Sequence, residues 1–467
     1  MEADMIGLTA QNLVASIKRR EISATELTQR ALKRIEASDP VLNAFTDVTT
    51  ERALREAAAV DRKLAAGDDP GPLAGVPYAV KNLFDIQGLP TLAGSKINRG
   101  YPPARRDATL IQRLQAAGAV LLGGLNMGEY AYDFTGENSH YGPTRNPHDP
   151  RYMAGGSSGG CGAAVAAAQV ALALGSDTNG SIRVPSSFCG LFGLKPTYGR
   201  LSRAGAFPFC TSLDHLGPFA RSAYDLALAY DAMQGSDPLD PACTTPPPQP
   251  VFPQLGTGLK DLRIAVANDY FAHGGTPQAY AAVAQVASAL RATHVVSLPE
   301  AARARAAAFV VTNCEGAHLH LDRLRQRAAD FDPDVRDRLL AGALMPANWY
   351  LQAQRFRHWY HREVLKVFEQ VDVVLAPATP CSAPEIGQKQ LVIEGVTVML
   401  RPNIGIYTQP LSFIGLPIVA APIQEAGGLP IAVQVIAAPW REDRVLRVAA
   451  ELENQGVAAS PAVLRDF

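Results

Sequence analysis

The segment GGSSGGCGAAVAAAQVALALGSDTNGSIRVP, residues 155–185, joins a glycine-rich loop to an alanine-rich helix and then to a second glycine turn. In 155–160, four glycines flank two serines and free the backbone for positive φ angles and close approach. The alanine run at 161–168 is a good helix former without bulk, so the loop leads into a helix N-terminus. A nucleotide-binding loop would end in Lys-Ser or Lys-Thr, but Cys-Gly stands there. Taken alone, the loop is equally consistent with a flexible turn that has no chemical role.

A second serine follows on a sharp turn. Ser181 comes 24 residues after Ser157, directly after Gly180 in the segment 175–185. A nucleophilic hydroxyl needs exposure on a tight turn whose backbone N–H groups can hold the oxyanion formed on attack. Ser181 is therefore the candidate nucleophile. Neither serine motif contains a histidine, so a Ser-His-Asp hydrolase is left open but without support from the sequence.

Lys81 is the candidate base in place of a histidine. It follows the apolar run 76–80, which predicts a buried strand that ends at the lysine. Burial disfavours the ammonium form and lowers a lysine pKa toward the range in which the amine accepts a proton. A lone lysine is more often an exposed charge. The combination with the two serine motifs favours the catalytic interpretation.

The rest of the chain alternates helical and strand patterns. Apolar spacing predicts N-terminal helices within 9–38 and an amphipathic helix at 107–118. Seven prolines crowd the segment 235–258 and predict a surface connection without regular structure. Because the α/β pattern continues beyond it, we expect one large α/β domain over 1–467. The expected strands are 76–80, 119–123, 262–267, 371–376, 418–422 and 431–436, the last two as a hairpin joined by 424–430.

Composition excludes several classes of protein. The 467 residues carry 43 Lys+Arg against 44 Asp+Glu, a net charge of −1, which argues against nucleic acid as a partner. With 47% hydrophobic and 19% charged residues, the chain can build a large core. The acidic N-terminus lacks the pattern of a signal peptide, and no apolar run predicts a membrane span. Six cysteines without a CxxC pair predict buried thiols, so we expect a cytoplasmic protein.

Lys81 and the two serine motifs, with their spacing, resemble the amidase signature family of Ser-Ser-Lys amidohydrolases. The resemblance extends from about residue 5 to 455 and includes the segments 190–200, 214–218 and 428–434. It implies a single large mixed β-sheet covered by helices. It also implies amide hydrolysis through an acyl-enzyme, without a cofactor or a metal.

The family motifs imply a role for each matching residue. Ser181 would be the nucleophile, Ser157, after a cis peptide bond, the relay, and neutral Lys81 the base. The oxyanion hole would consist of Thr178, Asn179, Gly180 and Ser181, and the supporting residues would be Ser158, Asp177 and Arg183. Arg357 matches a segment that supplies a carboxylate-binding arginine in relatives, with Arg355 and Arg401 as rivals.

Within the family, the segments 125–129, 137–147 and 177–181 resemble the branch that hydrolyses 1-carboxybiuret in cyanuric acid breakdown. The expected substrate is therefore a small carboxylated urea-like amide that releases ammonia. The alternatives are an ammonia-donating A-type subunit of a glutamyl-tRNA amidotransferase and a general small-amide amidase. Both named relatives work with a small helical subunit, so we expect such a partner and an oligomer.

Two features stand apart from the family pattern. The family usually has two glycines before the nucleophile, whereas this chain has Asn179 and Gly180, which narrows the turn or adds a contact with substrate. Two histidine pairs have spacings that metal ligands also show, but no HExxH motif or carboxylate set accompanies them. The pairs are His318 with His320 and His358 with His361. We therefore expect no metal.

Overall fold

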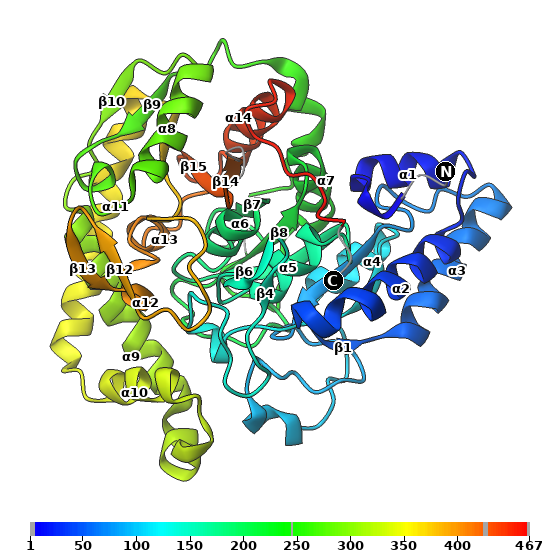
Figure 1. The fold of residues 1–467 in the computed structure, drawn as a ribbon, viewed down its shortest axis with the longest axis horizontal. Coiled ribbons are helices and arrows are strands. Elements are labelled where there is room, and N and C mark those ends of the chain that lie inside the picture. The colour runs from blue at the N-terminus through cyan, green and yellow to red at the C-terminus, as the bar shows by residue number, and fades with distance from the viewer. Residues whose placement is uncertain (1–4, 244–245, 424–427, 465–467) are drawn as a thin grey trace.

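The computed structural model describes residues 5–243, 246–423 and 428–464. One mixed sheet of 11 strands runs through the molecule (Figure 1). In spatial order its strands are β1 (Phe45–Val48), β3 (Val120–Leu125), β2 (Pro77–Lys81), β6 (Leu172–Asp177), β8 (His215–Ala220), β7 (Phe192–Lys195), β14 (Ile418–Ile423), β15 (Ile431–Ala437), β11 (Val373–Pro377), β9 (Ile264–Ala267) and β10 (His294–Val296). The predicted α/β fold with a single mixed sheet is confirmed.

The sheet has two parallel blocks around an antiparallel centre, and its edge strand β1 pairs antiparallel with β3. Strands β3, β2 and β6 run parallel, as do β11, β9 and β10, whereas the strands from β6 through β15 to β11 pair antiparallel. The predicted hairpin of β14 and β15 is confirmed by its register, in which Val419 faces Val435. Part of its predicted connection, 424–427, lies outside the described residues. Two small hairpins lie apart from the sheet, β4 (Arg145–Asn146) with β5 (Asp149–Met153) and β12 (Gln390–Ile393) with β13 (Val396–Met399).

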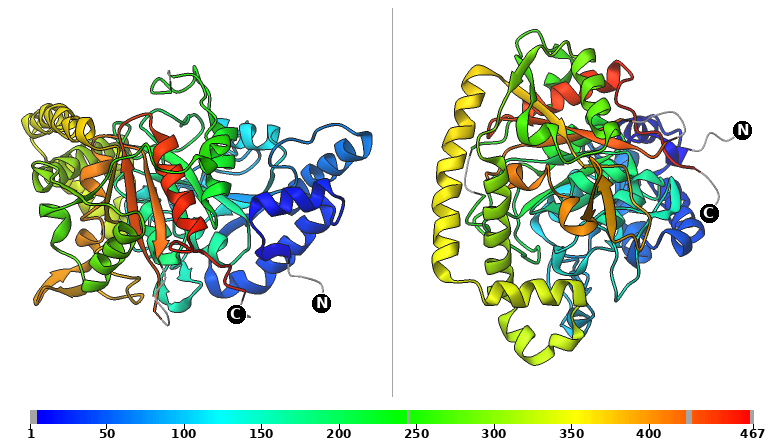
Figure 2. Two further views of the ribbon diagram at one scale, coloured as in Figure 1. Left: turned by 90° about the horizontal axis from the view of Figure 1, so that it is seen from above. Right: turned by 60° about the vertical axis from the view of Figure 1, so that its left-hand side comes forward.

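Helices cover both faces of the sheet: α14 packs on β14 and β15 from one side and α8 packs on β15 and β11 from the other (Figure 2). The helices are α1 (Ala10–Lys18), α2 (Ala24–Leu42), α3 (Thr50–Ala66), α4 (Thr109–Ala116), α5 (Gly159–Ala166), α6 (Arg183–Cys189), α7 (Ala223–Met233), α8 (Pro277–Ala289), α9 (Ala301–Arg327), α10 (Pro333–Ala343), α11 (Ala347–Gln370), α12 (Leu400–Asn403), α13 (Gln409–Ser412) and α14 (Glu442–Asn454). Short 3-10 helices occur at Met5–Gly7, Lys96–Gly100, Glu129–Ala131, Phe252–Thr257, Asp269–Ala272 and Ala328–Asp330.

Local sequence explains the N-terminal helices. Ser23 caps α2, because its side chain accepts from the backbone N–H of Glu26 at 3.0 Å. The two predicted helices are present, and α2 extends four residues beyond the predicted end at residue 38. Figure 1 shows α1, α2 and α3 at the opposite end of the molecule from α9, α10 and α11.

The proline-rich segment differs from the prediction in one place. Residues 252–257 form a 3-10 helix, whereas 235–258 was expected to hold no regular element. Pro253 stands in the first turn of this helix, where its fixed φ fits and the missing N–H costs no hydrogen bond. A single cluster of buried apolar side chains extends from Ala10 to Ala458. That 1–467 forms one domain stays a prediction.

Candidate active site

Lys81 ends strand β2 in the interior of the molecule. The apolar residues before it are buried because β2 pairs in parallel with β3 on one side and β6 on the other. Lys81 itself is fully buried. Its Nζ donates to Ser157 Oγ at 2.7 Å and to Ser176 Oγ at 2.9 Å. The strand thus delivers the amine directly to one of the two predicted serines.

Burial changes the proton affinity of this amine. Removal from water lowers the pKa of Lys81 to about 7, and the carboxylates of Asp177, Asp214 and Asp133 only partly oppose the shift. The direction of this shift is the one expected from the sequence. A large share of Lys81 is therefore a neutral amine near neutral pH.

Ser157 lies on the glycine-rich loop that leads into α5. The peptide bond between Gly156 and Ser157 is cis, as the family resemblance implied. Gly155 has a φ of +82°, which favours glycine. Ser158 Oγ donates to the backbone oxygen of Ser176 at 3.2 Å, so this serine ties the loop to β6. The loop therefore brings Ser157 against Lys81 and fastens itself to the strand that leads to Ser181.

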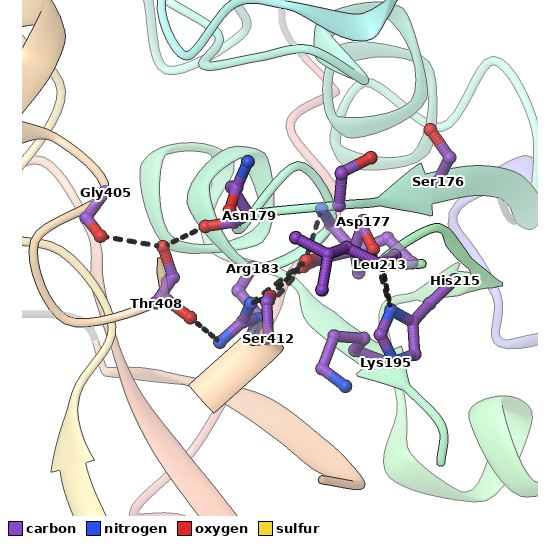
Figure 3. A network of polar contacts seen from close by, with 12 residues as sticks. Ser176, Asp177, Asn179, Arg183, Lys195, Leu213, His215, Gly405, Thr408 and Ser412 are labelled. Carbon is purple, nitrogen blue, oxygen red and sulfur yellow. Dashed lines mark hydrogen bonds and ion pairs between the residues drawn. The ribbon is translucent and has the colours of Figure 1, made fainter. Parts of the chain in front are cut away.

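Ser181 lies on the turn between β6 and α6. Gly180 has a φ of +140°, and a Cβ at this position would lie 2.3 Å from Thr408 Oγ1, so only glycine fits. The hydroxyl of Thr408 donates to the backbone oxygen of Asn179 at 2.6 Å (Figure 3). Within the described chain, the backbone N–H groups of residues 178–181 donate to no carbonyl oxygen. These free donors are what an oxyanion hole requires.

An ion pair between Asp177 and Arg183 supports this turn. Arg183 Nη2 and Nε each lie 2.9 Å from one carboxylate oxygen of Asp177, and both side chains are fully buried. Burial alone would raise the pKa of Asp177, but the Arg183 guanidinium overcomes this and keeps the pKa well below its usual range. Arg183 also donates to Gln434 Oε1 at 2.7 Å. It donates to Ser412 Oγ as well (Figure 3). The predicted charge-assisted brace is present.

The three predicted catalytic residues do not form one continuous chain of hydrogen bonds. Ser157 Oγ contacts Lys81, whereas Ser181 Oγ has no hydrogen-bond partner among the residues that the structure describes. Such catalytic hydrogen bonds commonly tighten only when substrate binds. The structure therefore places Lys81 and Ser157 in contact, and it leaves the hydroxyl of Ser181 free at the cavity wall.

Ser181 faces a small cavity of about 140 Å³. The side chains that line it come from the 131–134 loop, the 178–181 turn, α9, α10 and the 401–409 region. Two arginines, Arg338 and Arg401, are among them. Arg401 forms ion pairs with Asp133 at 2.8 Å, Asp334 at 3.0 Å and Glu137 at 3.6 Å. Its charge is therefore already balanced by the protein.

Arg338 is different, because no carboxylate within the described chain forms an ion pair with it. Its Nε donates to the backbone oxygen of Asp334 at 2.6 Å, and its Nη2 donates to the backbone oxygen of Tyr132. The guanidinium also lies 3.8 Å from the ring centroid of Tyr132. Burial lowers the pKa of Arg338 below the usual guanidinium value, yet a guanidinium stays charged in proteins. Arg338 thus brings a positive charge to the cavity that Ser181 also lines; Asp133 and Asp334 influence this charge, but neither forms an ion pair with it.

Arg357, the arginine predicted from the sequence, lies elsewhere. It lines a separate surface cavity of about 430 Å³ together with Trp440, and it is not among the residues around Ser181. Its guanidinium donates to the backbone oxygens of Phe413 and Ser212 at 2.6 and 2.7 Å. A role for Arg357 in substrate binding stays a prediction, while its rival Arg401 does reach the cavity.

Sequence reasoning missed three residues of the site: Ser176, Thr408 and Arg338. Ser176 stands inside the segment 155–185, one residue before Asp177, so its strand position could have indicated it. Thr408 and Arg338 lie far along the chain, at the start of α13 and on α10. No local pattern separates Arg338 from the other charged residues of its helix.

The other chemical groups give no second centre. No cluster of three metal-ligating side chains exists in residues 5–243, 246–423 and 428–464. His320 is buried among Tyr130, Phe207 and Phe331, and this burial lowers its pKa to about 3. All six cysteines are free thiols. Across the described ranges, no helix has the length and apolar character needed to cross a membrane.

The amidase family model matches residues 26–446. The chain belongs to the amidase family. It is 56% identical to AtzE, the 1-carboxybiuret hydrolase subunit of Pseudomonas sp. (strain ADP), over 96% of this chain and 98% of that protein. It is 38% identical to the A subunit of the glutamyl-tRNA(Gln) amidotransferase of Methylococcus capsulatus, over 94% and 95%.

Solved structures agree with this assignment. A structure described as a vestigial protein complex that reveals the origins of an s-triazine catabolic enzyme has a TM-score of 0.96 and 55% identity, over 97% of this chain and 100% of that one. A bacterial aryl acylamidase of the amidase signature enzymes has a TM-score of 0.87 and 26% identity, over 96% of each chain. The chain is thus an amidase, a hydrolase of amide C–N bonds, with the fold that its sequence predicted.

Proposed function

We propose that this amidase releases ammonia from a small carboxylated urea-like amide, with 1-carboxybiuret as the substrate. The observation that carries the proposal is the presence, in one cavity of about 140 Å³, of Ser181 and of Arg338, whose guanidinium forms no ion pair within the described chain. Cavities for drug-sized ligands are commonly about 300–1,000 Å³, so this one suits a much smaller molecule. The 56% identity to a 1-carboxybiuret hydrolase subunit supports the same substrate.

In the proposed mechanism, Ser181 Oγ attacks the carbonyl carbon of the terminal amide. Its proton passes to Ser157 Oγ while the Ser157 proton passes to Lys81 Nζ, which must be neutral to receive it. The oxyanion accepts hydrogen bonds from the backbone N–H groups of the 178–181 turn. The tetrahedral intermediate then expels the nitrogen, which takes the proton back through Ser157 and leaves as ammonia.

The acyl-enzyme formed on Ser181 is then hydrolysed by the same residues. Water attacks the ester carbon, and its proton follows the path through Ser157 to Lys81. Breakdown of the second tetrahedral intermediate returns a proton to Ser181 Oγ and frees the acid. In both acylation and deacylation, protons move only among Ser181, Ser157, Lys81, the substrate and water.

Arg338 holds the substrate carboxylate in this proposal. A guanidinium presents paired N–H donors that match the two oxygens of a carboxylate. Arg338 lines the cavity and has no carboxylate partner in the described chain, whereas Arg401 has three. An unpaired, partly buried cation is costly, and a bound anion removes this cost. The arrangement favours substrates with a carboxylate at one end and the scissile amide at the other.

The experiment that tests this function measures ammonia release from 1-carboxybiuret, from biuret and from glutamine, each without and then with tRNA. We expect 1-carboxybiuret to be hydrolysed far faster than biuret, which lacks the carboxylate. Glutamine hydrolysis that requires tRNA and a partner complex would instead support the A-type amidotransferase subunit. Comparable rates on 1-carboxybiuret and biuret would contradict the proposed role of the carboxylate.

We also propose a cytoplasmic location and a small helical partner subunit. Apolar side chains at the α10–α11 end of the molecule support a partner: Leu344 is 85% exposed, and Trp349 and Leu351 are exposed beside it. The similarity to a protein named as a subunit, and to a structure described as a complex, agrees with this. Co-purification followed by light scattering tests it, since a monomer of the chain alone with full activity would contradict the need for a partner.

A further inference from the structure

The side chain of Asn179 has one polar atom with a partner and one without. Its Nδ2 donates to Thr312 Oγ1 at 3.0 Å, whereas Oδ1 is buried and accepts no hydrogen bond from any residue that the structure describes. Only 7% of Asn179 is exposed. A buried carbonyl oxygen without a partner is rare and costly, because it has lost its hydrogen bonds to water. The unpaired oxygen therefore points to a ligand that supplies the missing donor.

The amide lies at the wall of the catalytic cavity. Asn179 and Thr312 both line the cavity that contains Ser181, and the side-chain amide of Asn179 joins the two residues by a hydrogen bond. The backbone of Asn179 is fixed, since Thr408 Oγ1 donates to its carbonyl oxygen at 2.6 Å (Figure 3). Asn179 is therefore hydrogen-bonded both at its side-chain Nδ2 and at its backbone oxygen. It stands two positions before Ser181, the proposed nucleophile, and its unpaired atom is Oδ1.

The cationic donors of the cavity do not satisfy this oxygen. Arg401 donates to Asp133 at 2.8 Å, and Arg338 donates to the backbone oxygens of Tyr132 and Asp334. Neither arginine donates to Asn179 Oδ1. The acceptor therefore stays unpaired, and because it is itself buried in the unliganded protein, a substrate N–H reaches it only when the side chain of Asn179 turns toward the cavity.

We propose that Asn179 Oδ1 accepts a hydrogen bond from the substrate N–H that flanks the scissile carbonyl on its acyl side. This bond makes the enzyme selective for urea-like substrates. A urea-like substrate carries a second nitrogen on the scissile carbonyl carbon, whereas an ordinary carboxamide carries a CH₂ group there. The departing NH₂ is common to both classes and cannot distinguish them. The inference rests on the proposed function and adds to it the residue that recognises the urea group.

The physical basis is the cost of a missing partner. A CH₂ group beside the scissile carbonyl would leave Oδ1 unpaired in the complex, whereas an N–H group pairs it. Sites that are built to hydrogen-bond a substrate group discriminate strongly against analogues that lack it. Alanine at position 179 removes the acceptor and therefore the discrimination.

A matched pair of probes tests this directly. N-carbamoylglycine and succinamate each carry a primary amide and a carboxylate, and they differ only by NH or CH₂ beside the scissile carbonyl. The measurement is the ratio of kcat/KM for ammonia release, carbamoylglycine over succinamate, in wild type and in Asn179→Ala. Because intrinsic reactivity and any common damage to the oxyanion hole cancel, the change in the ratio reports the hydrogen bond. We expect the ratio to fall about tenfold or more, the loss expected for one hydrogen bond.

A ratio that stays within about twofold of wild type in Asn179→Ala overturns the proposal, since a lost hydrogen bond should exceed that change. If the variant loses activity on both probes, Thr312→Val decides, because it removes the hydroxyl that anchors Nδ2 and should lower the same ratio. An unchanged ratio in that variant also overturns the proposal. Thr257→Val, at an exposed position, is the matched control and should leave the ratio unchanged.

The outcomes separate this inference from the proposed function. If wild type releases ammonia from 1-carboxybiuret but turns over a probe too slowly to measure, the ratio is taken from dissociation constants in Ser181→Ala. If wild type hydrolyses neither 1-carboxybiuret nor the probes, the proposed function fails, and the inference fails with it. If wild type hydrolyses them and the ratio does not respond to Asn179, only the role of Asn179 is overturned.

Discussion

Lys81 Nζ lies 2.7 Å from Ser157 Oγ, and no carboxylate in the described chain forms an ion pair with it. The two nearest polar partners of the amine are the hydroxyls of Ser157 and Ser176, which do not compensate a positive charge as a carboxylate would. Burial therefore dominates and lowers the pKa of Lys81 to about 7. A lysine in this setting can act as a base at neutral pH.

The pH dependence of kcat/KM follows from this pKa. The working form is the neutral amine, so activity is low below pH 7, rises about tenfold per pH unit toward the pKa and levels off above it. The expected midpoint in the free enzyme is about 7. Initial rates of ammonia release across pH 5.5–9, a range of about 3.5 units around that pKa, measure it.

Lys81 variants are the control for this profile. Lys81→Arg and Lys81→Ala should both lose nearly all activity, because a guanidinium stays protonated and alanine accepts no proton. An arginine variant with nearly normal rates would show that Lys81 supplies only charge.

Ser181→Ala should abolish turnover without destabilising the fold. The change removes a hydroxyl that has no hydrogen-bond partner among the described residues, and the backbone of the turn stays in place. We expect kcat below about one hundredth of wild type, a barrier increase of more than about 2.7 kcal/mol. Thermal melting should show an unchanged midpoint. Activity above that level would remove Ser181 from the role of nucleophile.

Asp177→Asn should destabilise the protein and lower kcat. It leaves the guanidinium of Arg183 buried with a neutral partner, and breaking a buried ion pair costs about 3–5 kcal/mol. The turn that carries residues 178–181 loses its brace, so the oxyanion donors lose their alignment. Chemical denaturation measures the free energy of unfolding. Arg151→Ala, which removes an exposed pair with Asp149, is the control and should cost less than about 1 kcal/mol.

Arg338→Gln should raise KM for carboxylated substrates far more than for neutral ones. Glutamine can still donate hydrogen bonds through its amide, but it lacks the positive charge that the guanidinium presents to the cavity. A charge-assisted hydrogen bond is worth about 1.5–3 kcal/mol, so we expect kcat/KM for 1-carboxybiuret to fall about tenfold to a hundredfold, with a small effect on biuret. Arg357→Gln is the matched comparison, because Arg357 lines a different cavity. If Arg357 held the carboxylate, the effects of the two substitutions would be exchanged.

Activity should survive exhaustive dialysis against a metal chelator. The proposed proton path uses Lys81, Ser157 and Ser181 alone, and no metal-ligating cluster occurs in the described part of the chain. Ammonia release before and after dialysis is the measurement. If dialysis abolishes activity and a divalent cation restores it, the histidine pairs would again be candidate metal ligands.

The two serines and the lysine of the candidate site could be located from the sequence, because the chemistry proposed for them depends on local backbone features. Glycines on both sides of Ser157 and before Ser181 create the turns, and the apolar run before Lys81 creates the buried strand. The pairing of β14 with β15 also follows from two apolar runs that stand close together in the sequence. Such features act over a few residues, so a single sequence shows them directly.

Tertiary structure alone decided which distant residues complete the site. The order of the sheet places β7 between β8 and β14 and brings Thr408 and Arg183 together, with 225 residues between them along the chain. Arg338 enters the cavity from α10, whereas Arg357, equally charged and on the next helix, lines another surface. A charge pattern along the chain does not distinguish the two arginines, because the direction each side chain takes depends on how helices pack against the sheet. The sequence indicated the direction of the shift in the Lys81 pKa, but its size depends on the fold, since the extent of burial is a property of the residues packed around the amine.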